Sequence, residues 1–309
     1  MNSEQEQLRN LVNNVNLRGT LAELEVREGT NKNGIAYISL KGAVRFGDTG
    51  VETKRFRTYV QAQKSDGNDN KTYPDIKKWA DDAVSEADNK ELATKVSITG
   101  SLEANDYISS SEELVEAIEI NAKFFNEFKE TDDDPACVDV EGYIKAIQDE
   151  MKNDEPTGRK KVTLITTDFF RNAVVVKNII VPEDLAERFC EMFDVGDTAV
   201  LYLSYMLHKG EAKPKKTNGL GRQRVTEGKD YLELILVGAD DPEDMKEPIE
   251  KKVVKILMEE RAQKLKDLEE EGYQDTSESE ATAKSNKKGS AKKTTKVTAD
   301  DIDDDDIPF

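Results

Sequence analysis

Cations and tyrosines alternate along two consecutive segments near the start of the chain. Residues 36–45 and 55–62 each place them on one face of an extended strand, and the set is Tyr37, Lys41, Arg45, Arg55, Arg57 and Tyr59. A single-stranded polynucleotide is bound by cations that follow its phosphates and by aromatic rings on which its bases stack. With Glu52 expected on the opposite side, we expect this face to carry one sign of charge. The pattern favours a nucleic-acid surface over a solvated sheet face with scattered charges.

A second cluster of cations lies between residues 209 and 229. This segment carries seven Lys or Arg but only two acids, and the candidate contacts are Lys213, Lys215, Lys216, Arg222 and Arg224. Gly219-Leu220-Gly221 makes the segment flexible, so its cations are expected to wrap around a strand. A compatible alternative is that the segment folds back onto the acidic C-terminus, which would then occupy the empty site in place of DNA.

Patterns for catalysis or metal binding are weak. One histidine, His208, and two cysteines, Cys137 and Cys190, are too few for a histidine-based metal cluster or a disulfide framework. No Gly-x-x-x-x-Gly-Lys-Ser/Thr phosphate-binding pattern occurs. Residues 64–67 read Lys-Ser-Asp-Gly, which fits a ligase motif but lies in a polar turn. We expect no enzyme activity, no cofactor and no metal, and a nuclease or ligase fragment is disfavoured.

The charges are segregated along the chain. Its 309 residues include 45 Lys and Arg against 64 Asp and Glu, a net charge of −19 that would argue against a nucleic-acid partner if it were uniform. The last ten residues, however, hold six Asp and no base. Because no run of about eighteen apolar residues and no apolar signal segment is present, we expect a cytoplasmic protein without a membrane partner.

The first half of the chain predicts a β-rich domain over residues 14–131. Alternating apolar and polar residues indicate three half-buried antiparallel strands, then a helix from Asp75 to Ala87, then strands near 95–108 and 114–128. The run Asp132-Asp133-Asp134-Pro135 breaks this pattern and marks the expected domain boundary.

The second half, residues 136–242, repeats the order of elements. Leu17-Arg18-Gly19-Thr20-Leu21 and Val140-Glu141-Gly142-Tyr143-Ile144 share an apolar-x-Gly-x-apolar pattern, which favours duplication. Five strands with one helix between the third and fourth is the order of the OB-fold. We therefore expect a mainly β chain with two OB-fold-like five-stranded barrels, each with one helix. The basic segment would then be the loop between strands four and five, which flanks the oligonucleotide groove of this fold.

The remaining segments are expected to lie outside these two domains. Residues 1–13 form a polar arm, and residues 248–271 a helix with an apolar stripe that includes Val254, Met258 and Leu265. Residues 272–299 lack large apolar side chains and are expected to be a flexible linker before an acidic, disordered tip at residues 300–309.

The C-terminal ending is the most specific motif. The run Asp304-Asp305-Asp306-Ile307-Pro308-Phe309 resembles the tip of bacterial-type single-stranded DNA-binding proteins. This resemblance implies a tip that recruits replication and repair enzymes, with Phe309 entering an apolar pocket and its carboxylate meeting a cation. A merely solubilising acidic tail explains the aspartates but not the apolar-Pro-aromatic finish.

Two expected OB units in one chain differ from the single unit of the bacterial family and look more like a phage-encoded protein. The tetrameric assembly of that family is therefore in doubt, and a homo-oligomer stays one alternative. The expected function is sequence-independent binding that coats and protects single-stranded DNA in replication, recombination and repair. The other interpretation is a replisome adaptor whose OB-like barrels bind proteins rather than DNA.

Overall fold

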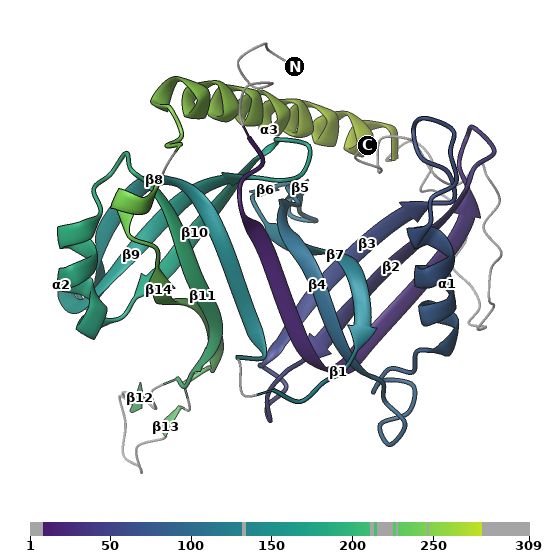
Figure 1. The fold of residues 1–309 in the computed structure, drawn as a ribbon, viewed down its shortest axis with the longest axis horizontal. Coiled ribbons are helices and arrows are strands. Elements are labelled where there is room, and N and C mark those ends of the chain that lie inside the picture. The colour runs from purple at the N-terminus through teal and green to yellow at the C-terminus, as the bar shows by residue number, and fades with distance from the viewer. Residues whose placement is uncertain are drawn as a thin grey trace.

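The computed structural model describes residues 9–131, 134–210, 213–214, 225–226, 228–245 and 247–279. Strands dominate these residues, and ten of them form one continuous sheet. This sheet curls into two barrels that lie side by side, with α3 (Lys251–Ser279) across the top (Figure 1). The expectation of a mainly β chain is confirmed.

The first barrel is a closed ring of five strands. Neighbouring strands pair in the order β1, β2, β3, β7, β4 and back to β1, and only the contact between β3 and β7 is parallel. The bounds are β1 Asn13–Thr30, β2 Ala36–Arg45, β3 Thr53–Gln61, β4 Lys95–Ala104 and β7 Ile118–Glu127. A small hairpin of β5 (Tyr107–Ile108) and β6 (Leu114–Val115) lies between β4 and β7 in sequence.

The helix of the first barrel, α1 (Thr72–Asp82), ends earlier than the expected Ala87. After Ala83 the chain is extended, and the backbone N–H groups of Glu86 and Ala87 donate to the carbonyls of Leu21 and Ala22 in β1. These backbone bonds to β1 replace the last helical turn. Ile76 and Ala80 of α1 pack on Ile38 and Leu40 of β2.

The second barrel repeats the pairing order of the first. Its ring runs β8, β9, β10, β14, β11 and back to β8, again with one parallel contact, between β10 and β14. The bounds are β8 Ala136–Lys152, β9 Glu155–Thr167, β10 Ala173–Val181, β11 Thr198–His208 and β14 Tyr231–Ala239. The single helix α2 (Glu183–Met192) again lies between the third and fourth strands. The short strands β12 (Lys213–Pro214) and β13 (Val225–Thr226) pair with each other and lie between β11 and β14 in sequence.

The shared glycine motif has the same role in both barrels. A Cβ atom at Gly19 in β1 would lie 2.1 Å from the carbonyl oxygen of Arg45 at the end of β2. A Cβ atom at Gly142 in β8 would lie 2.5 Å from the carbonyl oxygen of Ile165 in β9. In each barrel the first strand therefore has a glycine where the second strand's backbone comes closest, which only a residue without a side chain permits.

The two barrels are joined through their first strands. β1 pairs with β8 antiparallel, from Asn13 opposite Val140 to Leu17 opposite Ala136. Fully buried side chains on both strands, among them Val15 and Val138, belong to one apolar cluster that continues through both barrels. This pairing fixes how the two barrels face one another.

The C-terminal helix α3 follows a single 3₁₀ turn, η1 (Pro242–Asp244), and contacts both barrels. Its buried Val253, Val254 and Leu257 pack on Ile165 and Val175 of the second barrel. The helix continues to Ser279, so the part of the expected linker from residue 272 to 279 is helical, and the rest lies outside the described residues. No helix in the described part of the chain is long and apolar enough to cross a membrane.

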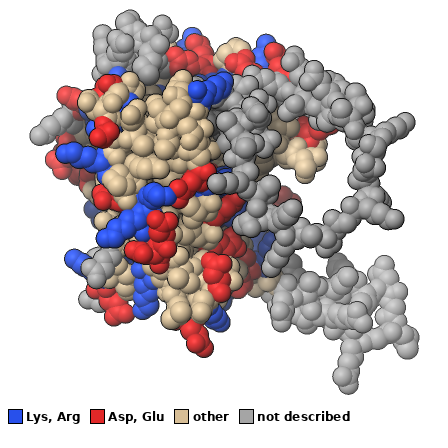
Figure 2. All heavy atoms as spheres, turned by 90° about the vertical axis from the view of Figure 1, so that its right-hand side faces the viewer, with Lys and Arg blue, Asp and Glu red and all other residues tan. Residues whose placement is uncertain are grey.

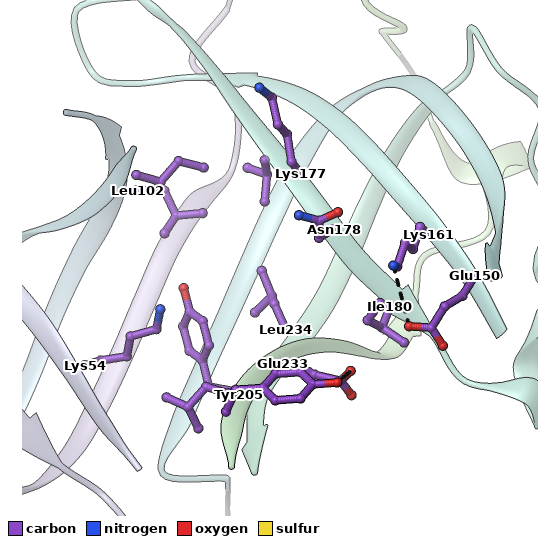
Figure 3. Close-up of a pocket in the computed structure, with 14 residues that line it drawn as sticks. Lys54, Leu102, Glu150, Lys161, Lys177, Asn178, Ile180, Tyr205, Glu233 and Leu234 are labelled. Carbon is purple, nitrogen blue, oxygen red and sulfur yellow. Dashed lines mark hydrogen bonds and ion pairs between the residues drawn. The ribbon is translucent and has the colours of Figure 1, made fainter. Parts of the chain in front are cut away.

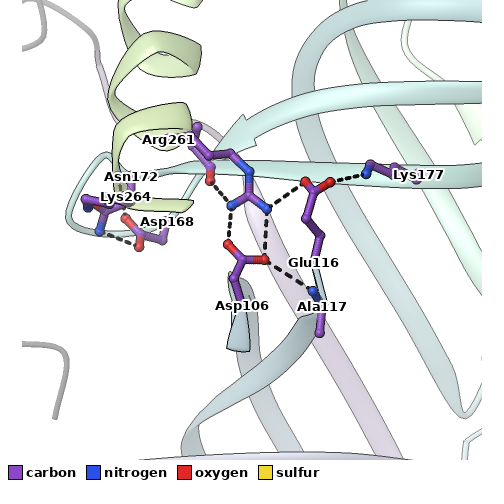
Figure 4. A network of polar contacts seen from close by, with 9 residues as sticks. Asp106, Glu116, Ala117, Asp168, Asn172, Lys177, Arg261 and Lys264 are labelled. Atoms are coloured by element: carbon purple, nitrogen blue, oxygen red, sulfur yellow. Dashed lines mark hydrogen bonds and ion pairs between the residues drawn. The ribbon is translucent and has the colours of Figure 1, made fainter. Parts of the chain in front are cut away.

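One arginine of α3 reaches the first barrel. Arg261 is 7% exposed, and its Nη1 lies 2.8 Å from Asp106 Oδ2 beside β5. Its Nη2 donates to Glu116 Oε2 at 3.2 Å, and Lys177 of β10 donates to the other oxygen of Glu116 at 2.9 Å (Figure 4). This ion cluster connects α3, the β5–β6 hairpin and the second barrel.

Candidate nucleic-acid interface

The expected aromatic face of the first barrel is only partly accessible. Tyr37 is 6% exposed, because its ring packs against Tyr59, with ring centroids 5.3 Å apart, and lies over Gly29 of β1. Tyr59 is half-buried, and burial raises its pKa. Tyr37 therefore does not offer a free ring to a base, contrary to the expectation from strand alternation.

Two of the four expected cations of this face are held in ion pairs. Arg45 contacts Glu86, in the loop after α1, at 2.5 and 3.0 Å, and these hydrogen bonds raise the pKa of Arg45 and lower that of Glu86. The Nε atom of Arg57 lies 3.4 Å from Glu119 of β7, and its Nη1 donates to Asn105 Oδ1 at 3.0 Å. The expectation of a one-signed face is wrong, because the acids come from neighbouring elements.

Lys41 and Arg55 are the exposed cations of the expected set. Lys41 lies directly opposite Arg57 on β3 and opposite Glu25 on β1, so an acid borders it as well. Figure 2 shows Lys and Arg interspersed with Asp and Glu on the side of the first barrel that faces away from the second. The mixed charge makes this face a weaker phosphate-binding surface than its own two strands suggest.

Most of the other expected site residues lie outside the described part of the chain. Lys213 starts β12 opposite Thr226. The remaining candidates that lie outside are Lys215, Lys216, Arg222, Arg224, Asp304, Asp305, Asp306, Ile307, Pro308 and Phe309. The described strands do show that this basic segment leaves the second barrel at His208 and returns at Tyr231.

A cleft of about 440 Å³ opens between the two barrels next to these two residues. Tyr231, Leu232, Glu233 and Leu234 of β14 line it, so it begins where the basic segment ends. Three lysines and two tyrosines also belong to its lining, and they come from both barrels: Lys54, Lys161, Lys177, Tyr205 and Tyr231 (Figure 3). None of these five residues is among those predicted from the sequence.

The two acids of the cleft are held by a neighbouring arginine. Arg159 of β9 lies between them, with its Nε 3.1 Å from Glu150 Oε2 and its Nη2 2.8 Å from Glu233 Oε2. Lys161 lies 3.7 Å from Glu150 and His208 3.4 Å from Glu233. Arg159 lies between the two carboxylates, and the three lysines that line the cleft outnumber its two acids.

Tyr231 has the geometry of a stacking platform. It is 47% exposed at the edge of the cleft, and one ring face packs on His208, with centroids 4.8 Å apart and an angle of 30° between the planes. A ring held on one side and open on the other suits base stacking. Its position directly after the basic segment was a usable sequence signal.

The turn between β9 and β10 carries two further exposed rings. Phe169 is 67% and Phe170 50% exposed, and the two rings meet edge to face. Lys123 of β7 lies 5.8 Å from the Phe169 ring centroid. Two consecutive Phe in a polar turn could have been noticed in the sequence.

In the described residues no group of three or more His, Cys, Asp or Glu is placed to hold a metal ion.

Comparisons with known proteins give one family and a set of structural likenesses. The family model described as YorF matches residues 11–271. A search of curated proteins found no match.

Three solved structures are similar to the chain at low TM-scores. A deletion mutant of the single-stranded DNA-binding protein from Thermus aquaticus has TM-score 0.47 and 14% identity, covering 76% of this chain and 96% of its own. The wild-type protein from the same organism has TM-score 0.45 and 15% identity, and the match covers 78% of this chain and 97% of that one. A mitochondrial single-stranded DNA-binding protein from S. cerevisiae has TM-score 0.25 and 13% identity, and the match covers 39% of this chain and 98% of that one.

Proposed function

We propose that this chain, which belongs to the YorF family, binds single-stranded DNA without sequence specificity. The observation that carries the proposal is the cleft between the barrels, lined by lysines and tyrosines at the point where the basic segment leaves and re-enters the second barrel. Lysines would neutralise phosphates and release their counterions, while Tyr231 would stack a base.

The barrel topology supports this assignment. Both rings have the strand order and the helix position of the OB-fold, and we interpret residues 14–131 and 136–242 as two OB-fold domains in tandem. In that fold the second and third strands, with the loop between strands four and five, form the oligonucleotide groove. In the second barrel these are β9, β10 and the basic segment, and Lys161 and Lys177 of the cleft lie on these two strands.

The acidic tip extends the proposal to partners. Its resemblance to bacterial-type tips supports recruitment of replication, recombination and repair enzymes through Ile307, Pro308 and Phe309, while the barrels coat and protect the strand. The same resemblance, combined with two OB-like units in one chain, supports a phage protein that acts in the cytoplasm of a bacterial host.

A titration with oligo(dT) tests the proposal. One OB-fold covers ~4–16 nucleotides, so an oligomer of roughly 30 nucleotides spans both barrels. We expect quenching of intrinsic tyrosine and tryptophan fluorescence, and log K falling with log salt at a slope of about −0.7 for each neutralised phosphate. Absence of binding in low-salt buffer would rule the proposal out.

A second candidate function, a replisome adaptor whose barrels bind proteins, is favoured by the paired charges of the first barrel. Arg57 bound to Glu119 and Asn105 resembles an ordinary solvated protein surface more than a phosphate-binding one. Protein binding without oligo(dT) binding would select the adaptor.

Replacing Tyr231 with alanine is expected to weaken oligo(dT) binding about 5- to 150-fold, because one stacked base contributes ~1–3 kcal/mol. Tyr107 is a matched control, since it is 48% exposed against 47% for Tyr231 and lies in the β5–β6 hairpin. Fluorescence anisotropy of a labelled oligomer measures both variants. Equal losses in the two variants would exclude Tyr231 as a specific platform.

A further inference from the structure

We propose that Lys54 of the first barrel holds a phosphodiester of the DNA strand in the cleft, so that both barrels build one binding site. The inference rests on the proposed function and adds the residue and the chemical group that meet there. It also places the contribution of the first barrel at Lys54, near the start of β3, and not on the face that carries Tyr59.

The position of Lys54 is unusual for a lysine. It pairs with the buried Val44 on β2 and shares its strand face with Phe56 and Thr58, both of which point into the barrel. A lysine at this register lies at the mouth of the barrel, and its side chain extends toward the second barrel. There its ammonium group lies 4.1 Å from the ring centroid of Tyr205 (Figure 3).

The surroundings of Lys54 leave its charge poorly compensated. Burial lowers the pKa of its ammonium and raises the pKa of Tyr205 to about 12, because both groups are withdrawn from water. The acids that line the cleft, Glu150 and Glu233, are held by Arg159. The Tyr205 ring offsets part of the desolvation of the ammonium, and an anion in the cleft would offset more.

The shape and lining of the cleft fit one unit of a polynucleotide. Its volume of about 440 Å³ lies within the usual range for a bound small molecule. Lys54 is on the first-barrel side, Lys161 and Lys177 are on the second-barrel side, and Tyr231 lies in the same lining. Lys161 and Lys177 already face Glu150 and Glu116, whereas no described acid pairs with Lys54, so Lys54 is the lysine of the lining that a phosphodiester with its base on Tyr231 would meet first.

The test compares three variants of the full chain with oligo(dT) of roughly 30 nucleotides. Lys54→Met keeps the apolar stem of the side chain and removes the charge. We expect its affinity at low salt to fall about tenfold, as for one lost charged hydrogen bond, and the salt slope to become shallower by about 0.7. Lys54→Arg should keep the slope of the wild type. Lys78→Met, on the exposed face of α1, should bind as the wild type does.

Thermal unfolding of the free protein separates this role from a structural one. Removing a half-buried ammonium that no described acid neutralises should leave the midpoint of Lys54→Met unchanged or raise it. If Lys54→Met has a lower unfolding midpoint but the wild-type salt slope for oligo(dT) binding, Lys54 only stabilises the contact between the two barrels, and the inference is wrong. Wild-type affinity in Lys54→Met would also overturn it, while the proposed function would stand. Failure of the wild type to bind would instead reject the proposed function.

Discussion

The variant Arg261→Ala is expected to lose about 3 kcal/mol of unfolding free energy. Arg261 is 7% exposed and contacts Asp106, whose side chain is 10% exposed, so its removal leaves a buried carboxylate without its cation. Breaking a buried pair from one side generally costs ~3–5 kcal/mol. The lower end applies here because Lys177 still compensates Glu116. Urea denaturation followed by circular dichroism measures the loss.

Lys266→Ala is the matched control on the same helix. Lys266 is 64% exposed and forms a solvent-exposed ion pair with Glu270, one helical turn further along α3. We therefore expect Lys266→Ala to lose about 0.5 kcal/mol or less of unfolding free energy. Combining Arg261→Met with Asp106→Asn should recover part of the loss, because the buried carboxylate disappears. Equal losses for Arg261→Ala and Lys266→Ala would contradict the assignment of Arg261 as the anchor of α3.

Alanine at Gly19 or Gly142 is expected to destabilise the fold by about 3 kcal/mol. The new Cβ atom would lie 2.1 Å from a backbone carbonyl oxygen in the first case and 2.5 Å in the second, and a strand backbone cannot move aside as a side chain can. Overpacking of this kind typically costs ~1–3 kcal/mol, and the backbone contact places these sites at the upper end. The midpoint of urea unfolding reports the change.

The control is the same substitution at Gly50. No atom lies within 4 Å of a Cβ built there, and its φ is not in the left-handed region. Gly50→Ala should therefore change the stability by less than about 1 kcal/mol, with either sign. A similar loss of stability at all three glycines would contradict the close approach of the two strands as the reason for the repeated motif.

Strand alternation predicted the main strands of both barrels and their order, but not the short β5–β6 and β12–β13 pairs. Alternation depends only on which face of a strand meets the core, and this local property was readable in β1, β2 and β3. The repeated glycine motif was readable too, because each barrel meets the same steric requirement at Gly19 and Gly142.

Strand alternation could not reveal what lies beside each face. Arg45 and Arg57 looked free in their own strands, yet Glu86 and Glu119 reach them from a loop and from a later strand. Tyr37 followed the polar alternation but is covered by Tyr59. The end of α1 was misplaced for a related reason, since backbone bonds to β1 replace its last turn.

The position of the candidate site depends on contacts between residues that are far apart in sequence. Lys54 and Tyr205 are far apart in sequence and belong to different barrels, and they meet because β1 pairs with β8. The physical reason is that burial and charge compensation depend on all neighbours in space, whereas periodicity reports only the direction in which each side chain leaves its own strand.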